Sequence, residues 1–297
     1  MKKRLCVLQI TPQHPNVKHV SYFKDKKECD FYFVTHDHQH PDSLKFCPNT
    51  KWADTRNILA AEVPKEYDYY AFIDYDYILR PQKNLKVLQQ ILEDLNTFEP
   101  AVLTYYPGKN LETPYAKDLQ YKNSKDYSCI PFTHSGLKIV HHSLMKWFFP
   151  MTTRGNSDIE SCHMFNIQEI PFLKHVVCSH KMVYDNGISD ENAVYNKNAA
   201  YAKSKMDDMW EWIRPAFKQT KLIDFIALND NQRRDSLTIK RSLVKMFKEK
   251  KVDPIASPKE VNYFDKKIMN KFFDLNHEHF RNIDASVKEQ YSHFSKK

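Results

Sequence analysis

The sequence contains little glycine: Gly108, Gly136, Gly155 and Gly187 are the only four in 297 residues. No Gly-x-Gly-x-x-Gly pattern occurs, which argues against a Rossmann dinucleotide site. No Gly-x-x-x-x-Gly-Lys-Ser/Thr pattern occurs either, which excludes a P-loop. A phosphate ligand would therefore have to be held by a metal ion and by Arg or Lys side chains, and not by a glycine-rich loop.

Cysteine and long apolar runs are also sparse. The six cysteines are scattered without a Cys-x-x-Cys spacing, which argues against a zinc site and predicts the reduced, buried thiols of a cytosolic protein. The apolar run from Leu5 to Ile10 is too short for the core of a signal peptide. No run of about 18 apolar residues occurs, so we expect no transmembrane segment. These features predict a cytoplasmic protein, in the host cytoplasm if the source is a virus.

The formal net charge of +8 is distributed unevenly along the chain. Residues 201–297 contain 21 Lys and Arg against 14 Asp and Glu, which leaves only +1 for residues 1–200. Apolar residues in this last third follow helical spacing, so it is predicted to be a basic α-helical module for acceptor binding or for structure. Such a helix can bind nucleic acid, anionic lipid or another anionic acceptor, or it can simply be a solvated face. Its most basic stretch contains Arg233, Arg234, Lys240 and Arg241.

Residues 1–200 alternate between apolar runs typical of strands and segments with helical spacing. This alternation predicts an α/β fold with a mixed, mostly parallel sheet flanked by helices. A polar segment over 109–128 is predicted to be a long loop. The expected strands cover 5–10, 30–35, 69–74, 101–106, 132–140 and 172–178, and the expected helices cover 52–63, 84–96, 141–149 and about 157–168.

Two carboxylates follow the apolar run from Tyr69 to Ile73, with one residue between them. Residues i and i+2 of a strand point to the same side, so Asp74 and Asp76 are predicted to converge on one divalent cation where the strand ends. Buried carboxylates repel each other unless a cation or protons neutralise them. Mg²⁺ or Mn²⁺ that also bridges a diphosphate suits such oxygen ligands. The alternative is a solvated turn, a position that Asp favours.

The helix expected upstream of this strand contains Arg56, a residue suited to bidentate phosphate contact, followed by Asn57. A helix with Arg-Asn that precedes a strand ending in Asp-x-Asp resembles the donor-binding half of GT-A-fold glycosyltransferases, over roughly residues 3–185. The resemblance implies a GT-A-like catalytic domain over 1–200. In it, Asp74 and Asp76 would hold Mn²⁺ or Mg²⁺ and the diphosphate of a nucleotide sugar, and Arg56 would contact the donor.

The resemblance also implies further site residues. His180, expected just after a strand, would be the third metal ligand, and Lys181 beside it would meet a phosphate. Asp37 follows the second strand and would contact the base or ribose, because ligands gather at the carboxyl ends of strands. Asp158 and Glu160 are expected at a helix N-terminus, where a carboxylate stays ionised. Asp158, with Glu160 as the second candidate, would deprotonate the acceptor in an inverting enzyme or hold the sugar in a retaining one. Simple helix capping would explain both residues equally.

The expected activity is the transfer of a hexosyl or pentosyl group from a nucleotide-diphosphate sugar to an acceptor hydroxyl. The acceptor is predicted to be a glycan or glycolipid head group, or hydroxymethylated DNA, as in the base glycosyltransferases of some bacteriophages. A sugar-phosphate nucleotidyltransferase is a further alternative, although the segment from Leu5 to Pro15 lacks the glycine-rich phosphate loop usual in that class. A non-enzymatic nucleic-acid-binding protein would account for the last third but not for the Asp-x-Asp strand.

Overall fold

The computed structural model describes residues 4–50, 52–81, 85–107, 121–122, 127–129, 136–149, 151 and 176–186. The helix expected over 157–168, with Asp158 and Glu160, and the basic module expected over 201–297 lie outside the described residues. No helix within the described part is long and apolar enough to cross a membrane.

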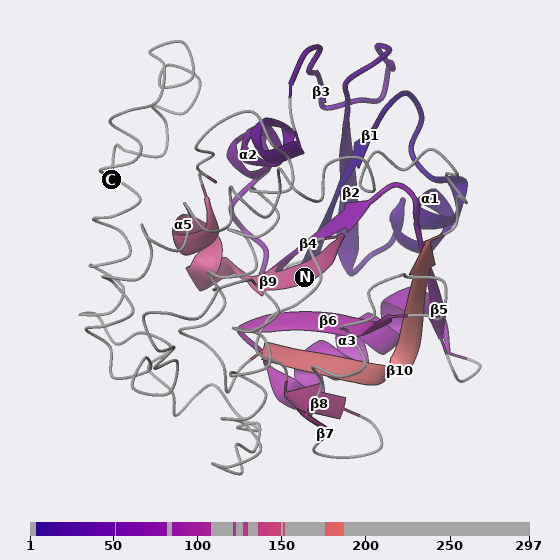
Figure 1. Cartoon of the computed structure of the whole chain (residues 1–297), viewed down its shortest axis with the longest axis vertical. Coiled ribbons are helices and arrows are strands. Elements are labelled where there is room, and N and C mark those ends of the chain that lie inside the picture. The colour runs from indigo at the N-terminus through magenta and orange to yellow at the C-terminus, as the bar shows by residue number, and fades with distance from the viewer. Residues whose placement is uncertain are drawn as a thin grey trace, which may run out of the picture.

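The elements are strands and helices in alternation up to β6, and mainly strands after it (Figure 1). The strands expected at 5–10, 30–35, 69–74 and 101–106 and the helix expected at 52–63 are confirmed to within one residue at each end. The elements are β1 (Leu5–Thr11), α1 (Val17–Phe23), β2 (Cys29–Thr35), β3 (Lys45–Phe46), α2 (Trp52–Glu62), β4 (Tyr69–Asp74), β5 (Tyr77–Pro81), α3 (Val87–Phe98), β6 (Val102–Pro107), β7 (Tyr121–Lys122), β8 (Tyr127–Cys129), β9 (Leu137–His141), η1 (His142–Leu144), α5 (Met145–Phe148) and β10 (Val176–Asn186).

All the described strands belong to one mixed sheet with the order β3-β2-β1-β4-β9-β6-β10-β8-β7, and β5 pairs with β10 beside this path. The strands β3, β2, β1 and β4 are parallel. β9 is antiparallel to both β4 and β6, while β10 is parallel to β6 but antiparallel to β5 and β8. The predicted mixed α/β sheet is therefore confirmed. Mostly parallel pairing holds only around β1, because β9 returns between β4 and β6.

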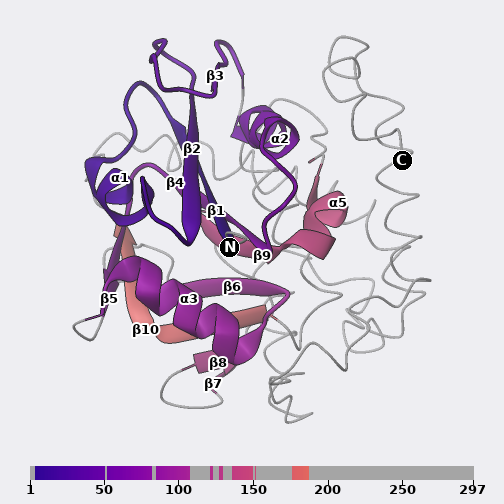
Figure 2. The ribbon, with the colours of Figure 1, turned by 180° about the vertical axis from the view of Figure 1, so that it is seen from behind.

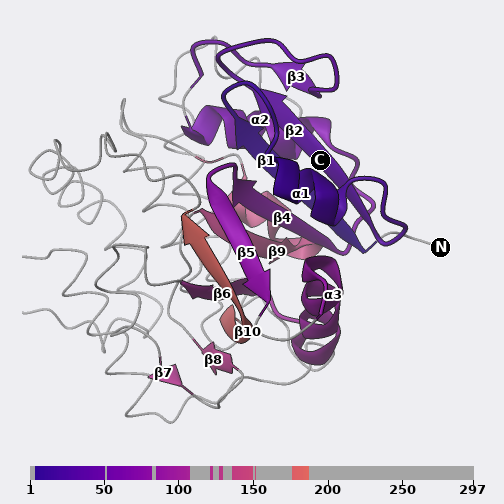
Figure 3. The ribbon, with the colours of Figure 1, turned by 90° about the vertical axis from the view of Figure 1, so that its right-hand side faces the viewer.

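Alternate residues of β4 face opposite sides of the sheet, as the period of a strand requires. Tyr69, Ala71 and Ile73 belong to the core to which residues of α1 and α3 contribute. Figures 2 and 3 show these two helices together on one face of the sheet. Phe72 instead stacks on Phe149, just after α5, with ring centres 4.8 Å apart. Asp74 follows Phe72 by two residues and therefore points to the same side of the sheet, away from α1 and α3.

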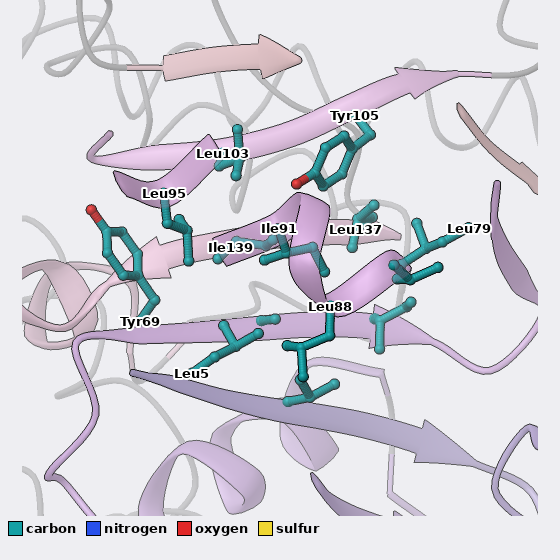
Figure 4. Packing of buried hydrophobic residues seen from close by; sticks show 14 of the residues in the cluster. Leu5, Tyr69, Leu79, Leu88, Ile91, Leu95, Leu103, Tyr105, Leu137 and Ile139 are labelled. Carbon is teal, nitrogen blue, oxygen red and sulfur yellow. The ribbon is translucent and has the colours of Figure 1, made fainter. Parts of the chain in front are cut away.

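The core on the α3 side is built from an apolar helix stripe and inward-facing strand residues (Figure 4). Leu88, Ile91 and Leu95 follow helical spacing on α3 and are buried. They pack with Leu5 of β1 and Ile139 of β9, among others. Each fully buried Leu or Ile contributes about 1.5–3 kcal/mol of transfer free energy, so this layer holds the two halves of the sheet together.

Three stretches differ from the sequence predictions. The loop expected over 109–128 contains β7 and the start of β8, which pair with each other. β10 continues to Asn186, well beyond the expected end at Cys178. β5 was not expected, because its apolar run is only Tyr77 to Leu79, and it follows β4 after a two-residue turn. Strands β5 and β8 depend on pairing with β10, and such pairing between distant segments leaves little trace in a local sequence pattern.

Candidate active site

The carboxyl ends of β1, β2 and β4 meet at one edge of the sheet. Ile10 of β1 pairs with Asp74 of β4, and β1 pairs with β2 along the full length of both strands. The loops after β1 and β2 are joined, since the backbone N–H of Asp37 donates to the carbonyl of Pro12 at 2.9 Å. Ligands of α/β sheets collect at this edge. The structure therefore brings Asp37 and Asp74 to the same edge, at the ends of strands whose axes are two steps, or about 10 Å, apart.

The carboxylate of Asp74 is bound to a buried guanidinium. Arg56 of α2 is 1% exposed, and its Nη2 lies 2.5 Å from Oδ1 of Asp74, whose side chain is 21% exposed. The guanidinium also lies 3.5 Å from the ring centre of Trp52, one helical turn earlier. Burial raises the pKa of Asp74, while the charge of Arg56 and hydrogen bonds from Arg56 and Trp52 act in the opposite direction. The two residues that the sequence assigned to the donor diphosphate are thus in direct contact.

The neighbour of Arg56 has a structural role. The Asn57 side chain donates to the carbonyl of Met151 at 2.9 Å and accepts from the backbone N–H of the same residue at 2.6 Å. These two bonds are buried and join α2 to the residue that lies shortly after α5. The Arg-Asn pair therefore combines a side chain aimed at the strand end with one that fixes the helix carrying it.

Asp76 lies in a turn and not on a strand. β4 ends at Asp74 and β5 begins at Tyr77, so Tyr75 and Asp76 form the connection. The alternation of a strand therefore does not apply to Asp76, and the convergence of the two carboxylates on one cation stays a prediction. The turn is held on one side by the N–H of Asp74, which donates to the carbonyl of Gly136 at 2.9 Å. Asp76 is partly exposed, which leaves it accessible to a ligand.

Gly136 explains how closely this turn approaches β9. A Cβ at this position would overlap the ring of Tyr77, the first residue of β5. Only glycine permits this approach, because it has no Cβ. The contact sets the position of Tyr77 and therefore the exit of the turn that contains Asp76.

The Asp37 side chain is the most exposed of the predicted ligands. It is 59% exposed, and its Oδ1 lies 2.8 Å from Nδ1 of His36. Its backbone is fixed by the bond to Pro12, whereas its carboxylate faces outward from the loop after β2. This position suits a contact to a polar ligand at the strand ends, and the nucleotide role of Asp37 stays a prediction.

His180 and Lys181 lie within β10, not after its end as the sequence had suggested. His180 is 8% exposed. Its neighbour Lys181 reaches Asp94 of α3, with Nζ 3.4 Å from Oδ1. In sheet order β9 and β6 separate β4 from β10, which corresponds to about 14 Å between the strand axes. The structure does not bring Lys181 to Asp74, and the ligand roles of both residues stay predictions.

The far end of β10 lies nearer to the turn than His180 does in the strand register. Asn186 pairs with Tyr77 and Asp185 pairs with Ile78, directly after Asp76. His180 precedes this pairing by six positions, or about 20 Å of extended chain. Asp185 is therefore a candidate by backbone position that the sequence analysis missed. The signal that could have revealed it is the strand character of Lys181 to Tyr184, which places a second acidic residue at a strand end.

Among the described residues, no three His, Cys, Asp or Glu side chains gather closely enough to hold a metal ion. The described part therefore offers two neighbouring carboxylates, those of Asp74 and Asp76, at the strand edge. Two carboxylates suffice for Mg²⁺ where substrate phosphates and water complete the coordination, which is its usual arrangement in nucleotide sites. The predicted catalytic residues Asp158 and Glu160 lie outside the described residues.

Comparison with known proteins gives no sequence match and a structural similarity at low identity. No family model matches the chain, and no curated protein matches it in sequence. Among solved structures it is similar to one described as the crystal structure of GalNAc-T7 with UDP, GalNAc and Mn²⁺, with 10% sequence identity and a TM-score of 0.43. The match covers 84% of this chain and 55% of that one, so the chain spans about half the length of the protein it resembles.

Proposed function

We propose that this protein is a metal-dependent glycosyltransferase that moves a sugar from a nucleotide-diphosphate sugar to an acceptor hydroxyl. The observation that supports this most strongly is the Arg56–Asp74 pair at the carboxyl end of β4, with Asp76 in the turn that follows. A buried ion pair is weak as a source of stability, since well-packed apolar residues often stabilise as much or more. Its location at the sheet edge where ligands collect favours a binding role.

The residues of this turn fit a divalent cation of the Mg²⁺ or Mn²⁺ type. Carboxylate oxygens are the ligands these ions prefer, and Asp74 and Asp76 would hold the ion together with the donor diphosphate. His180 and Asp185 are the two candidates for a further protein ligand, and the register of β10 favours Asp185. When bound, the ion would act as a Lewis acid that neutralises the departing nucleoside diphosphate.

The remaining roles belong to the side chains of the chain itself. Arg56 holds the Asp74 carboxylate in one orientation and places a fixed positive charge beside the diphosphate. Asp37, at the end of β2, accepts hydrogen bonds from the ribose or the base. Asp158 accepts the proton of the acceptor hydroxyl if the configuration inverts and holds the sugar if it is retained, with Glu160 as the second candidate.

The acceptor that we propose is anionic. Residues 201–297 carry a net +7 by their Lys, Arg, Asp and Glu content, against +1 for residues 1–200. When a polyanion binds such a basic region, it releases the counterions condensed on it, and this release favours binding. DNA with hydroxymethylated bases is one acceptor of this kind, and an anionic glycan or glycolipid head group is the other.

Thermal shifts with a panel of nucleoside diphosphates and nucleotide sugars, with and without Mn²⁺, test the donor half of this proposal. We expect one nucleotide to raise the Tm only when Mn²⁺ is present, since ligands stabilise the state they bind. Asp76→Asn should abolish the Mn²⁺-dependent part. The matched control is Glu62→Gln at the end of α2, which removes an exposed carboxylate that pairs with Lys45 of β3. This variant should show the same Mn²⁺-dependent rise in Tm as the wild type.

Three outcomes would contradict the proposal in different ways. A wild-type protein with no metal-dependent shift for any nucleotide is not a donor-binding transferase of this class. If Asp76→Asn keeps the Mn²⁺-dependent rise in Tm, the metal does not bind at the Asp74–Asp76 turn. Stabilisation by a nucleoside triphosphate together with a sugar 1-phosphate, but not by nucleotide sugars, would favour the nucleotidyltransferase alternative.

A further inference from the structure

The turn that contains Asp76 is tied to the start of α1 by one side chain. The Nδ2 group of Asn16 donates to the carbonyl of Tyr75 at 2.6 Å, and its Oδ1 accepts from the backbone N–H of Lys18 at 2.9 Å. Asn16 is the N-cap of α1, so the second bond is an ordinary cap. The first bond is not part of capping, because it joins the helix start to the residue between Asp74 and Asp76.

Two further polar residues hold Asn16 in place. The backbone N–H of Asn16 donates to Oε1 of Gln9 at 2.9 Å, and Nε2 of Gln9 donates to Nδ1 of His19. Gln9 lies on β1 and His19 on α1, and both are fully buried. Gln9 has the parity of Leu5 and Val7, which pack in the apolar core, so a carboxamide stands where the strand pattern would place an apolar residue.

A packing role alone does not explain this arrangement. Burying a carboxamide and an imidazole costs free energy unless they are hydrogen-bonded, and apolar residues of similar size would pack as well. The network instead orients the backbone carbonyl of Tyr75, because Gln9 fixes the backbone of Asn16 and the side chain of Asn16 fixes that carbonyl. The imidazole of His19 also lies beside the backbone of Tyr77, so the network touches the turn on both sides of Asp76.

We propose that Asn16, supported by Gln9 and His19, is a positioning residue that holds the Tyr75–Asp76 turn in the conformation that binds the metal–diphosphate group. The proposal rests on the proposed function for the ligand, but the clamp itself is a property of the fold. Asn16 acts through the backbone of Tyr75 and touches neither the ion nor the donor. Its loss should therefore loosen the turn and weaken metal binding, while the helix that it caps can be preserved.

The substitution Asn16→Ser separates the clamp from the cap. Serine caps helices about as well as asparagine, but its hydroxyl is too close to the backbone to cap Lys18 and reach Tyr75 together. The matched control is Ser21→Gly, an exposed α1 position whose hydroxyl bonds to the carbonyl of Lys18 and does not touch the turn. Glycine weakens a helix by backbone entropy, so this control lowers the stability of α1 without altering the clamp.

Hydrogen exchange of the peptide that contains residues 74–77 is the first measurement. We expect about fivefold faster exchange in Asn16→Ser, the effect of losing one net hydrogen bond, and wild-type exchange in Ser21→Gly. Equal exchange in wild type and Asn16→Ser would overturn the clamp. This result does not depend on whether any nucleotide binds, so it is separate from a failure of the proposed function.

The Mn²⁺ concentration at half-saturation, with UDP as the nucleotide probe, is the second measurement. We expect it to rise about fivefold in Asn16→Ser and to stay unchanged in Ser21→Gly, while UDP affinity at saturating Mn²⁺ stays near the wild-type value. If Asn16 had only a structural role, the Mn²⁺ concentration at half-saturation would rise in both variants in proportion to their loss of Tm. A wild-type half-saturation value in Asn16→Ser, alongside faster exchange, would mean that the clamp has no part in metal binding and would overturn the proposal.

Discussion

Two ion pairs, each with one buried side chain, lie in different parts of the sheet. In one pair the carboxylate reaches solvent, and in the other the cation does. In the pair at the end of β4, Arg56 is buried and the Asp74 side chain is 21% exposed. In the pair between β10 and α3, the Asp94 side chain is fully buried and Lys181 is 17% exposed. The carboxylate is therefore accessible at the strand edge and sealed beneath α3. The accessible carboxylate of Asp74 can bind a ligand directly, whereas the sealed carboxylate of Asp94 cannot, and the ligand role of Lys181 stays a prediction.

The Asp94 pair supports an irregular strand. β10 pairs with β6 up to Ser179, shifts register before Val183, and then pairs with β6 again on one side and with β5 on the other. Lys181 lies within this shift and reaches Asp94, which also accepts a hydrogen bond from Nε2 of Gln90 at 3.1 Å. A bulge of this kind redirects a strand. The pair thus holds the bend that leads β10 toward the turn of Asp76.

The largest expected effect separates the two carboxylates by activity. Asp74→Asn should lower the rate of transfer from the donor about 100-fold or more, because it removes one of the two proposed metal ligands. Asp94→Asn should leave the rate per folded molecule within about twofold. Rates are measured with the nucleotide sugar that gives the largest thermal shift, with folded fractions matched by circular dichroism. A similar loss in both variants would mean that the two pairs serve the fold alike.

For the free energy of unfolding, by contrast, we expect a large effect from the Asp94–Lys181 pair. Lys181→Met leaves the buried Asp94 charge without its cation and should lower the free energy of unfolding by about 3 kcal/mol, at the low end for buried pairs because Lys181 is partly exposed. Urea unfolding monitored by tryptophan fluorescence measures this. The double variant Asp94→Leu, Lys181→Met should recover most of the loss, since an apolar pair of similar volume packs well. If the double variant is no better than the single one, the pair is not the source of the effect.

The clamp network predicts a pH dependence. Burial lowers the pKa of His19 to about 4 from 6.5, although the backbone of Tyr77 acts in the opposite direction. Between these values the native protein binds fewer protons than the unfolded chain, so stability falls as the pH falls from 7 to 4. The loss reaches about 3 kcal/mol. Burial raises the pKa values of Asp74 and Asp94, which opposes this trend, so the comparison must be between variants.

His19→Gln provides that comparison, since glutamine cannot gain a proton in this range. Urea unfolding at pH 7 and pH 4.5 should show a smaller pH effect in the variant than in the wild type. Identical pH effects would show that His19 does not stay neutral in the folded protein. A larger effect in the variant would mean that His19 is protonated and stabilising at low pH.

The smallest expected effect concerns residues 201–297. Replacing Arg233, Arg234, Lys240 and Arg241 by Gln should leave Mn²⁺-dependent donor binding unchanged and weaken the binding of duplex DNA. The slope of log affinity against log salt should become shallower by about 0.9 for each phosphate that the variant no longer neutralises. Fluorescence anisotropy at several salt concentrations measures the slope. Acceptor binding that is independent of salt in both proteins would argue against a polyanionic acceptor.

Local sequence patterns were sufficient for the parallel half of the sheet. The apolar runs at 5–10, 30–35 and 69–74 form strands, because a short continuous apolar run suits a strand that is largely covered on both faces. The helical spacing at 52–63 places Arg56 on α2, and the contact between Arg56 and Asp74 follows from a helix that returns to the neighbouring strand. These inferences succeed because periodicity and burial are properties of short segments.

The rest of the site depends on contacts between distant segments. Whether Asp76 lies on a strand or in a turn depends on β5, which forms against β10 about a hundred positions later. The partner of Lys181 is decided by α3, and the contact of Asn16 with Tyr75 joins the start of α1 to the end of β4. By itself the sequence determined the α/β class, the central strands, and the two residues Arg56 and Asp74 that meet at the strand edge. Only the tertiary structure decided the turn at Asp76, the bend of β10 and the clamp, because register and long-range hydrogen bonds are set by the packing of whole elements and leave no periodic signal in the chain.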